Sequence, residues 1–412
     1  MKYRNILILI VLTAIISIVT LIHNGVLTTH DSASYVEAFD NIYLGSPDRF
    51  RTPIYPLVVG GFCQLFGVTA GCLATVIFQH LVFLISVPFF YKATQQIFKS
   101  DLWAFAIAGV YILAAEHFNW NNYIMTESLS TSGMAFLLYF TTSVVEKPSI
   151  KSAAWLFLTG ALLLMLRPAH IYIIPAFLAG FGIAWFFKRL RKAANAGLFA
   201  TIGIGLIVVG YMCAFKAAYG TFAISNVSTF NKYYSLRQNG LFEPSKIENP
   251  EIASLIVGFY AKNGRTTDDI ISTYAEIETL DTQFPISEFE RTVNNTIAQN
   301  RSEWYKIILS RPYMSLSYYG KEEITVTSLL KNKMFYIYLL MIVATIVTII
   351  ALVKRRIDIY SGIIYLLGAG HLAVAIIGAQ GDWPRLIDPA ISVYVVMAAL
   401  VVASIFCRRK KV

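Results

Sequence analysis

Long apolar stretches, separated by short polar segments, recur along most of this chain. Ten of them approach the roughly 20 residues that a helix needs to cross a bilayer. They cover residues 5–27, 70–91, 102–117, 123–145, 152–167, 169–187, 194–217, 334–353, 359–378 and 387–406. This pattern predicts an all-α polytopic membrane protein with about ten transmembrane helices.

The polar loop after the first apolar stretch has structure of its own. Within it, Asp31, Ser34, Tyr35 and Ala38 have the spacing of residues that share one face of a short helix lying along the membrane surface. A further apolar run, 53–67, is short and carries two prolines. We expect this run to be an interfacial helix that does not cross the membrane.

The longest polar segment, 218–333, mixes acidic and basic residues like a soluble surface. It has amphipathic stretches and little β alternation, which predicts a small and mainly helical domain. The expected organisation is an N-terminal transmembrane module over 1–217 with about seven spans and a first outer loop at 28–69. The helical domain at 218–333 follows, and then a C-terminal module over 334–412 with about three spans.

The composition agrees with a membrane protein and excludes several other classes. The chain has 412 residues, of which 56% are hydrophobic and 14% charged, whereas soluble domains carry about 25% charged residues. The four cysteines lack the paired spacing of a zinc site. We expect them to serve packing, although Cys63 and Cys72 fall on the same predicted outer side, where a disulfide is chemically allowed.

The net charge of +10 is unevenly distributed between the two sets of loops. One set is rich in Lys and Arg and holds only Asp101, Glu146 and Asp358 as acidic residues. Because cytoplasmic loops collect basic residues, both termini are predicted to be cytoplasmic and the 218–333 domain extracytoplasmic. The first span is expected to be an uncleaved anchor. The excess charge thus describes orientation and contact with anionic membrane lipids, and no nucleic-acid partner is expected.

Several ionisable residues stand at the predicted outer ends of the spans, where such groups are costly unless they pair or act. Asp31 follows the first span, Glu127 begins the fourth, and Arg167 ends the fifth. The last outer loop adds Asp382 and Arg385. Simpler roles compete with a functional one. The carboxylates could complement helix N-termini, Arg167 could snorkel, and the last two residues could form a local ion pair.

Arg51 and Tyr55 frame a rigid proline-containing turn before the interfacial helix. This arrangement holds a cation and a phenol at headgroup depth, where an anionic lipid phosphate is the natural ligand. Tyr35 belongs first to an aromatic belt at the membrane interface. His30 lies beside Asp31, and further histidines approach the same face, but no metal-ligand spacing is present. No metal is therefore assigned, and a divalent cation stays open as an unsupported alternative.

The order of these features resembles the GT-C superfamily of integral-membrane glycosyltransferases, especially the protein O-mannosyltransferase and lipid A aminoarabinose transferase branch. The matching motifs are D31-S-A-S-Y35, R51-T-P-I-Y55-P-L, Glu127, the Arg167–Pro168 pair and the P-R-L-x-x-P of the last outer loop. The likeness covers about the first 220 residues and that last loop.

The resemblance implies transfer of a sugar from a polyprenyl-phosphate donor to an acceptor outside the cytoplasm, commonly with inversion. Displacement at the anomeric carbon needs a base, and we expect Asp31 to be that base, with Glu127 orienting the acceptor or sharing its proton. The donor phosphate is then expected at Arg51, Tyr55 and Arg385, with Arg167 behind them. Tyr35, His30 and Asp382 are candidates for contact with the sugar or with a lipid, glycan or protein acceptor. The expected location is a bacterial inner membrane, with the site facing the periplasm.

Other functions stay open at this point. A transporter or flippase for a lipid-linked saccharide favours charged residues near the bilayer midplane, whereas the candidates here gather at one end of the spans. A ligase or polymerase of lipid-linked saccharides leans on outer-loop arginines, and a carboxylate in the first loop argues against it. A non-catalytic membrane scaffold is a further alternative.

Overall fold

A computed structural model of the chain describes residues 2–114, 116–267, 269–317, 324–354, 358–378 and 383–406. These residues are helical throughout, apart from loops and one isolated β-bridge between Leu27 and Tyr123. The chain forms two compact units. Unit 1 comprises 1–209, 332–374 and 384–412, and unit 2 comprises 210–331 and 375–383. The protein is thus an all-α polytopic membrane protein, as the apolar pattern predicted.

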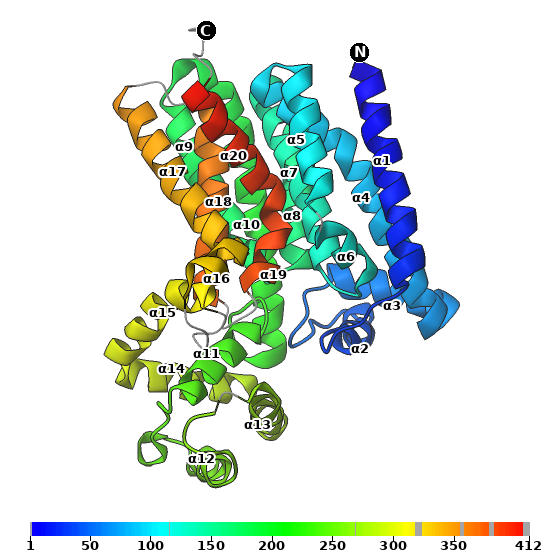
Figure 1. Ribbon diagram of the computed structural model, residues 1–412. Coiled ribbons are helices and arrows are strands. Elements are labelled where there is room, and N and C mark those ends of the chain that lie inside the picture. The colour runs from blue at the N-terminus through cyan, green and yellow to red at the C-terminus, as the bar shows by residue number, and fades with distance from the viewer. Residues whose placement is uncertain are drawn as a thin grey trace. The chain divides into compact units, whose positions relative to one another are not determined.

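Unit 1 is a bundle of long helices that stand side by side (Figure 1). Its first half contains α1 (Lys2–Asn24), α2 (Ser32–Tyr43), α3 (Ile54–Phe66), α4 (Val68–Phe98), α5 (Asp101–Leu113), α6 (Glu116–Asn122), α7 (Glu127–Glu146), α8 (Ile150–Leu166), η1 (Pro168–Tyr172) and α9 (Ile173–Trp185). Then come η2 (Lys188–Leu190), most of α10 (Arg191–Tyr219), α17 (Lys333–Val353), most of α18 (Ile359–Gly378), α19 (Trp383–Ile387), η4 (Asp388–Ala390) and α20 (Ile391–Phe406).

Among the described residues, 8 helical segments are long and apolar enough to cross a membrane. They account for eight of the ten predicted spans. The other two predicted spans correspond to the shorter apolar helices α5, with 13 residues, and α8, with 17 residues. Helix α3 also has 13 residues, so it is about 20 Å long and too short to cross roughly 30 Å of hydrocarbon. Its length agrees with an interfacial position.

The boundary between α8 and η1 lies where the sequence places it. Arg167 has an extended backbone, with φ of −153° and ψ of 121°, because a residue that precedes proline is disfavoured in the helical region. Pro168 then begins a new helical turn. This break places the Arg167 side chain at the end of the bundle where α7 begins.

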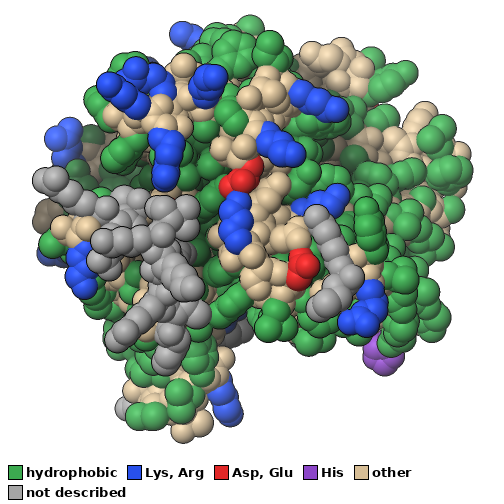
Figure 2. All heavy atoms as spheres, turned by 90° about the horizontal axis from the view of Figure 1, so that it is seen from above, with side chains coloured by type: hydrophobic (Ala, Val, Ile, Leu, Met, Phe, Trp, Pro, Cys, Tyr) green, Lys and Arg blue, Asp and Glu red, His purple; other side chains and the backbone are tan. Residues whose placement is uncertain are grey.

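Basic side chains gather at the end of unit 1 where α1 begins and α20 ends. Figure 2 looks down on this face and shows many Lys and Arg side chains and few acidic ones. Exposed basic residues at helix ends there include Arg4, Lys92, Lys99, Lys147, Lys151, Lys188, Arg189, Arg191, Lys192 and Lys354. They come from the loops in which the sequence predicts a basic excess, and such an excess is typical of a cytoplasmic face.

Unit 2 contains the end of α10, then α11 (Val227–Gln238), η3 (Pro244–Lys246), α12 (Pro250–Asn263), α13 (Ile270–Gln283), α14 (Ile286–Gln299), α15 (Arg301–Leu316) and α16 (Val326–Lys331). Its core is built around Tyr233, Phe242, Ile256, Leu280 and Phe289. The described residues of unit 2 form helices joined by loops. Its helices carry enough buried apolar side chains to form a core of their own.

Candidate active site

The first loop of unit 1 is fixed to the segment that leads into α7. The backbone N–H of Leu27 donates to the carbonyl of Asn122 at 2.8 Å, and that of Ile124 donates to the carbonyl of Leu27 at 2.9 Å. The Ser32 hydroxyl donates to the carbonyl of Ile124 at 3.0 Å. These bonds bring the start of α2, with Asp31 before it, to the start of α7, where Glu127 is the first residue.

Arg51 is held by the face of α2 that the sequence predicted. Its Nη2 lies 2.9 Å from Asp31 Oδ1, its Nε donates to Ser34 Oγ at 2.8 Å, and its Nη1 donates to Tyr35 Oη at 3.2 Å. The guanidinium also lies 4.2 Å from the centre of the Tyr35 ring. The turn before it is closed by Asp48, whose Oδ1 accepts the N–H of Arg51 at 2.8 Å. Hydrogen bonds thus hold both the backbone and the side chain of Arg51 in place.

Tyr55 lies beneath this cluster in the first turn of α3 and is fully buried. Its ring stands edge-on to that of Tyr35, with 4.8 Å between the ring centres. Its hydroxyl donates to Gln79 Oε1 at 2.8 Å, and the Gln79 amide donates to the carbonyls of Asn121 and Tyr123 at 2.9 Å each. Tyr55 therefore supports Tyr35 and positions the segment that precedes α7.

Glu127 is 1% exposed and lies between two arginines. Its Oε1 is 3.1 Å from Arg167 Nη1 and 3.3 Å from Arg385 Nε. The three residues come from α7, from the break after α8 and from α19. Burying a charge away from water costs free energy, and the attraction between the Glu127 carboxylate and the two guanidinium groups offsets this cost. Arg385 faces Glu127 here, and the predicted ion pair of Arg385 with Asp382 falls on a residue outside the described part of the chain.

The cluster around Arg51 and the cluster around Glu127 lie close enough for the charges of one to shift pKa values in the other. Burial raises the pKa of Asp31, but the charge and hydrogen bond of Arg51, followed by the charges of Arg385 and Arg167, outweigh burial and hold the pKa below its ordinary value. Burial likewise raises the pKa of Tyr35, against the lowering effect of Arg51, and the charge of Glu127 adds to the increase. Asp31 is therefore an ionised carboxylate near neutral pH, whereas Tyr35 remains a phenol that can donate a hydrogen bond.

A neighbouring buried cluster was not recognised as a unit in the sequence. Asp388 is 1% exposed and forms an ion pair with Lys333 at the start of α17. The indole N–H of Trp120 donates to Asp388 Oδ2 at 2.8 Å, and the Thr131 hydroxyl donates to its carbonyl at 3.3 Å. Thr131 stands one turn after Glu127 on α7. The sequence signals for this cluster are a lysine at the start of an apolar run, Lys333, and an aspartate within I-D-P, Asp388.

Two further predicted residues are His30 and Asp382. His30 is exposed on the surface beside Asp31. Asp382 falls outside the described residues. Among the residues that the structure describes, no group of three or more His, Cys, Asp or Glu side chains could hold a metal ion.

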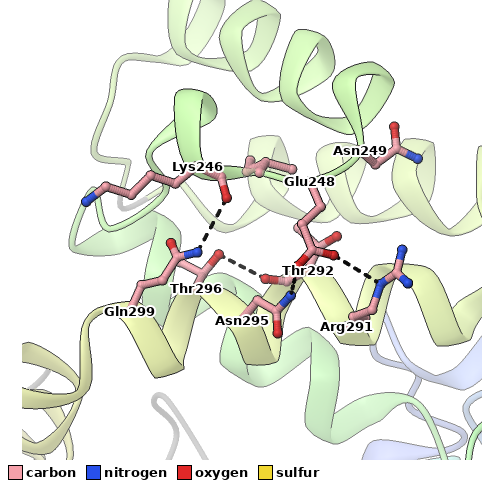
Figure 3. A pocket seen from close by; sticks show the side chains of 9 residues that line it. Lys246, Glu248, Asn249, Arg291, Thr292, Asn295, Thr296 and Gln299 are labelled. Atoms are coloured by element: carbon pink, nitrogen blue, oxygen red, sulfur yellow. Dashed lines mark hydrogen bonds and ion pairs between the residues drawn. The ribbon is translucent and has the colours of Figure 1, made fainter.

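Unit 2 has a small polar hollow between α14 and the segment before α12 (Figure 3). Its side chains pair largely with one another. Asn295 donates to Glu248 Oε1 at 3.1 Å, Gln299 donates to the carbonyl of Lys246 at 3.4 Å, and Arg291 lies 3.7 Å from Glu248. These contacts join the two segments of unit 2. The candidate site residues described above all belong to unit 1, so this hollow is not part of that site.

Comparisons with known proteins give a likeness to solved structures. No family model matches the chain, and no curated protein matches it. The crystal structure of ArnT from Cupriavidus metallidurans bound to undecaprenyl phosphate covers 95% of this chain and 77% of its own, at 11% identity and a TM-score of 0.39. The apo structure of the same protein covers 95% and 76%, at 12% identity and a TM-score of 0.36. The functional assignment rests on the side chains of unit 1.

Proposed function

We propose that unit 1 is the catalytic part of a membrane glycosyltransferase, which moves a sugar from a polyprenyl-phosphate donor to an acceptor hydroxyl. The observation that carries the proposal is the meeting of two carboxylates, Asp31 and Glu127, with three arginines at one end of the bundle. The five groups carry a formal charge of +1, so a donor phosphodiester with one negative charge neutralises them. The GT-C resemblance of the same residues points to the same chemistry.

The leaving group determines what the arginines do. As the bond between the anomeric carbon and the phosphate oxygen breaks, that bond's electron pair stays on the phosphate, whose negative charge grows. Fixed cations stabilise this growing charge without having to reorganise. Arg51 and Arg385 are the proposed phosphate ligands, and Arg167 holds Glu127 beside them. The buried Tyr55 supports the site through Tyr35, so its predicted phosphate contact becomes a positioning role in this proposal.

The acceptor hydroxyl must lose its proton as its oxygen attacks the anomeric carbon. Asp31 is ionised and half-exposed beside Arg51, so one of its oxygens can accept that proton. When the donor phosphate approaches Arg51, it shares the guanidinium with Asp31 and weakens the ion pair. This exchange restores basicity to the carboxylate when the donor is present. Glu127 is the proposed orienting group, because its own charge is compensated by two arginines.

The site is proposed to face the periplasm of a bacterial inner membrane, with the donor tail lying along α3 and unit 2 selecting the acceptor. The basic face in Figure 2 lies at the opposite end of unit 1, which supports this orientation. Attack from the side opposite the phosphate inverts the anomeric configuration. Product analysis of the transferred sugar tests this stereochemical outcome.

The decisive assay uses the full-length protein in lipid nanodiscs with a panel of polyprenyl-phosphate sugars and with lipid, glycan and protein acceptors. The expected result is release of free polyprenyl phosphate together with a glycosylated acceptor. Binding of the donor without any chemical change, combined with movement of the intact donor across vesicles, would instead support a flippase. Formation of long saccharide chains from lipid-linked units would support a polymerase.

A further inference from the structure

Cys63 near the end of α3 and Cys72 near the start of α4 lie on either side of the sharp bend between the two helices. Gly67 forms this bend with φ of +77°, a backbone conformation that glycine adopts without strain. Beyond it the two helices pack closely, because a Cβ placed on Gly71 would lie 2.4 Å from the Cα of Cys63. The backbone of α4 next to Cys72 therefore touches the backbone that carries Cys63.

The Cys63 side chain also contacts the first turn of α4. Cys63 Sγ lies 3.8 Å from the carbonyl oxygen of Val68, and Val68 stands one helical turn before Cys72 on the same face of α4. The Cys72 side chain also contributes to the environment of the Cys63 thiol, whose pKa it helps to raise. Cys63 is buried at 9% exposure and Cys72 is partly exposed. Both are free thiols in this structure.

We propose that Cys63 and Cys72 are a disulfide-forming pair that links α3 covalently to α4 in an oxidising compartment. The co-reactant is a thiol–disulfide oxidant, RSSR. The Cys72 thiolate attacks one sulfur of RSSR, forming a mixed disulfide and releasing RS⁻. Cys63 then attacks the Cys72 sulfur of that mixed disulfide, and the second RS⁻ leaves. The two thiol protons end on the two RS⁻ groups, so the step yields one protein disulfide and two RSH.

The order of attack follows from the environments of the two thiols. Burial, followed by the charge of Cys72 and its hydrogen bond, raises the pKa of Cys63 to about 11. Since the thiolate is the nucleophile, the buried Cys63 is a poor first attacker, and the more exposed Cys72 starts the reaction. Helix α4 has 31 residues and is about 46 Å long, so it extends beyond a hydrocarbon layer of roughly 30 Å. Its first turns, with Cys72, are accordingly within reach of an aqueous oxidant.

The link would stabilise the bend on which the candidate site depends. Cys63 lies two turns after Tyr55 on α3, and Cys72 lies two turns before Gln79 on α4. The hydrogen bond between Tyr55 and Gln79 joins the same two helices at their other contact. A disulfide between the helices would limit their separation in the unfolded chain as well as in the native one.

Oxidised glutathione and alkylation test the pair in the full-length protein in nanodiscs. One tryptic peptide, 52–92, carries both cysteines, so its mass reports their state directly. After oxidation, this peptide should be lighter by two hydrogen atoms and take up no alkylating reagent, while Cys213 remains alkylated as an internal control. Recovery of both thiols as alkylated cysteines, with the same yield as in the reduced sample, would overturn the proposal.

Two single variants and a membrane sample complete the test. Oxidation should raise the melting temperature of the wild type by several degrees, and it should not raise that of Cys63→Ser or Cys72→Ser. Each variant should keep one thiol that reacts with glutathione. In native membranes prepared from cells that were alkylated before lysis, the peptide 52–92 should appear in its oxidised form. Free thiols in that sample would contradict the proposal. None of these readouts depends on sugar transfer. The native-membrane result rests on the periplasmic orientation proposed above, whereas the nanodisc results with oxidised glutathione do not, so the two proposals can fail separately.

Discussion

Asp31 and Arg51, separated by 20 residues in the first loop, form an ion pair with 2.9 Å between Oδ1 and Nη2. The same guanidinium binds Ser34 and Tyr35, so three side chains of one helix face define its direction. A carboxylate and a cation fixed in this way can act on two reacting atoms at once, the acceptor oxygen and the phosphate.

Arg51→Lys keeps the positive charge but loses the fork that reaches Asp31, Ser34 and Tyr35 together. A lysine offers one point charge in place of a planar set of donors. We expect the KM for the polyprenyl-phosphate donor to rise about 10- to 100-fold, the equivalent of about 1.5 to 3 kcal/mol for a charged hydrogen bond. Arg189→Lys, on the exposed basic face, is the matched control. Equal donor KM in the two variants would remove Arg51 from the phosphate site.

Glu127→Gln should destabilise the folded protein because it removes the negative charge that lies between Arg167 and Arg385. Removing one member of a buried ion pair costs about 3 to 5 kcal/mol, and Glu127 is 1% exposed. The measurement is the free energy of unfolding in detergent, with the exposed Glu303→Gln as control. Added polyprenyl phosphate should restore part of the lost stability, since its phosphate replaces the missing charge. A variant as stable as the control would mean that the three charges are not coupled.

The low pKa of Asp31 predicts a specific dependence of stability on pH. A carboxyl group whose pKa in the folded state is lowered by its partner stabilises the protein above the pKa of the unfolded chain, and this contribution disappears as the pH falls through the lowered value. The ordinary value is 3.8. The difference in melting temperature between wild type and Asp31→Asn should thus be constant from about pH 8 to pH 5 and shrink only below about pH 4. A difference that vanishes between pH 5 and 7 would indicate a raised pKa.

Tyr55→Phe removes the hydroxyl that donates to Gln79 Oε1 and leaves that oxygen buried without this donor. The expected loss is about 1 to 3 kcal/mol in the free energy of unfolding. Gln79→Leu alone should also destabilise, because the carbonyls of Asn121 and Tyr123 lose their donor. A double-mutant cycle over the two positions should give a coupling of at least about 0.5 kcal/mol. Additive losses would show that the bond does not join α3 to α4 energetically.

Much of the fold and part of the site could be predicted from the sequence, because they depend on local patterns. The helix face with Asp31 and Tyr35, the break at Arg167 and the helical domain all follow from residue spacing or from proline chemistry. The meeting of Glu127 with Arg385 does not, since it depends on where α19 packs against α7. The link between Leu27 and Tyr123 and the role of Gln79 are long-range pairings of the same kind. These pairings explain why the candidate site residues come together. From the sequence alone, only their predicted position on the same side of the membrane suggested this.

The central claim is that Asp31 takes the proton of the acceptor hydroxyl during sugar transfer. Single-turnover transfer by wild type, Asp31→Asn and Glu303→Gln, each in nanodiscs loaded with the same polyprenyl-phosphate sugar, tests it most directly. The account predicts that Asp31→Asn still binds the donor but transfers the sugar about 100- to 10,000-fold more slowly, while Glu303→Gln matches wild type. Sugar transfer by Asp31→Asn at the wild-type rate would contradict it.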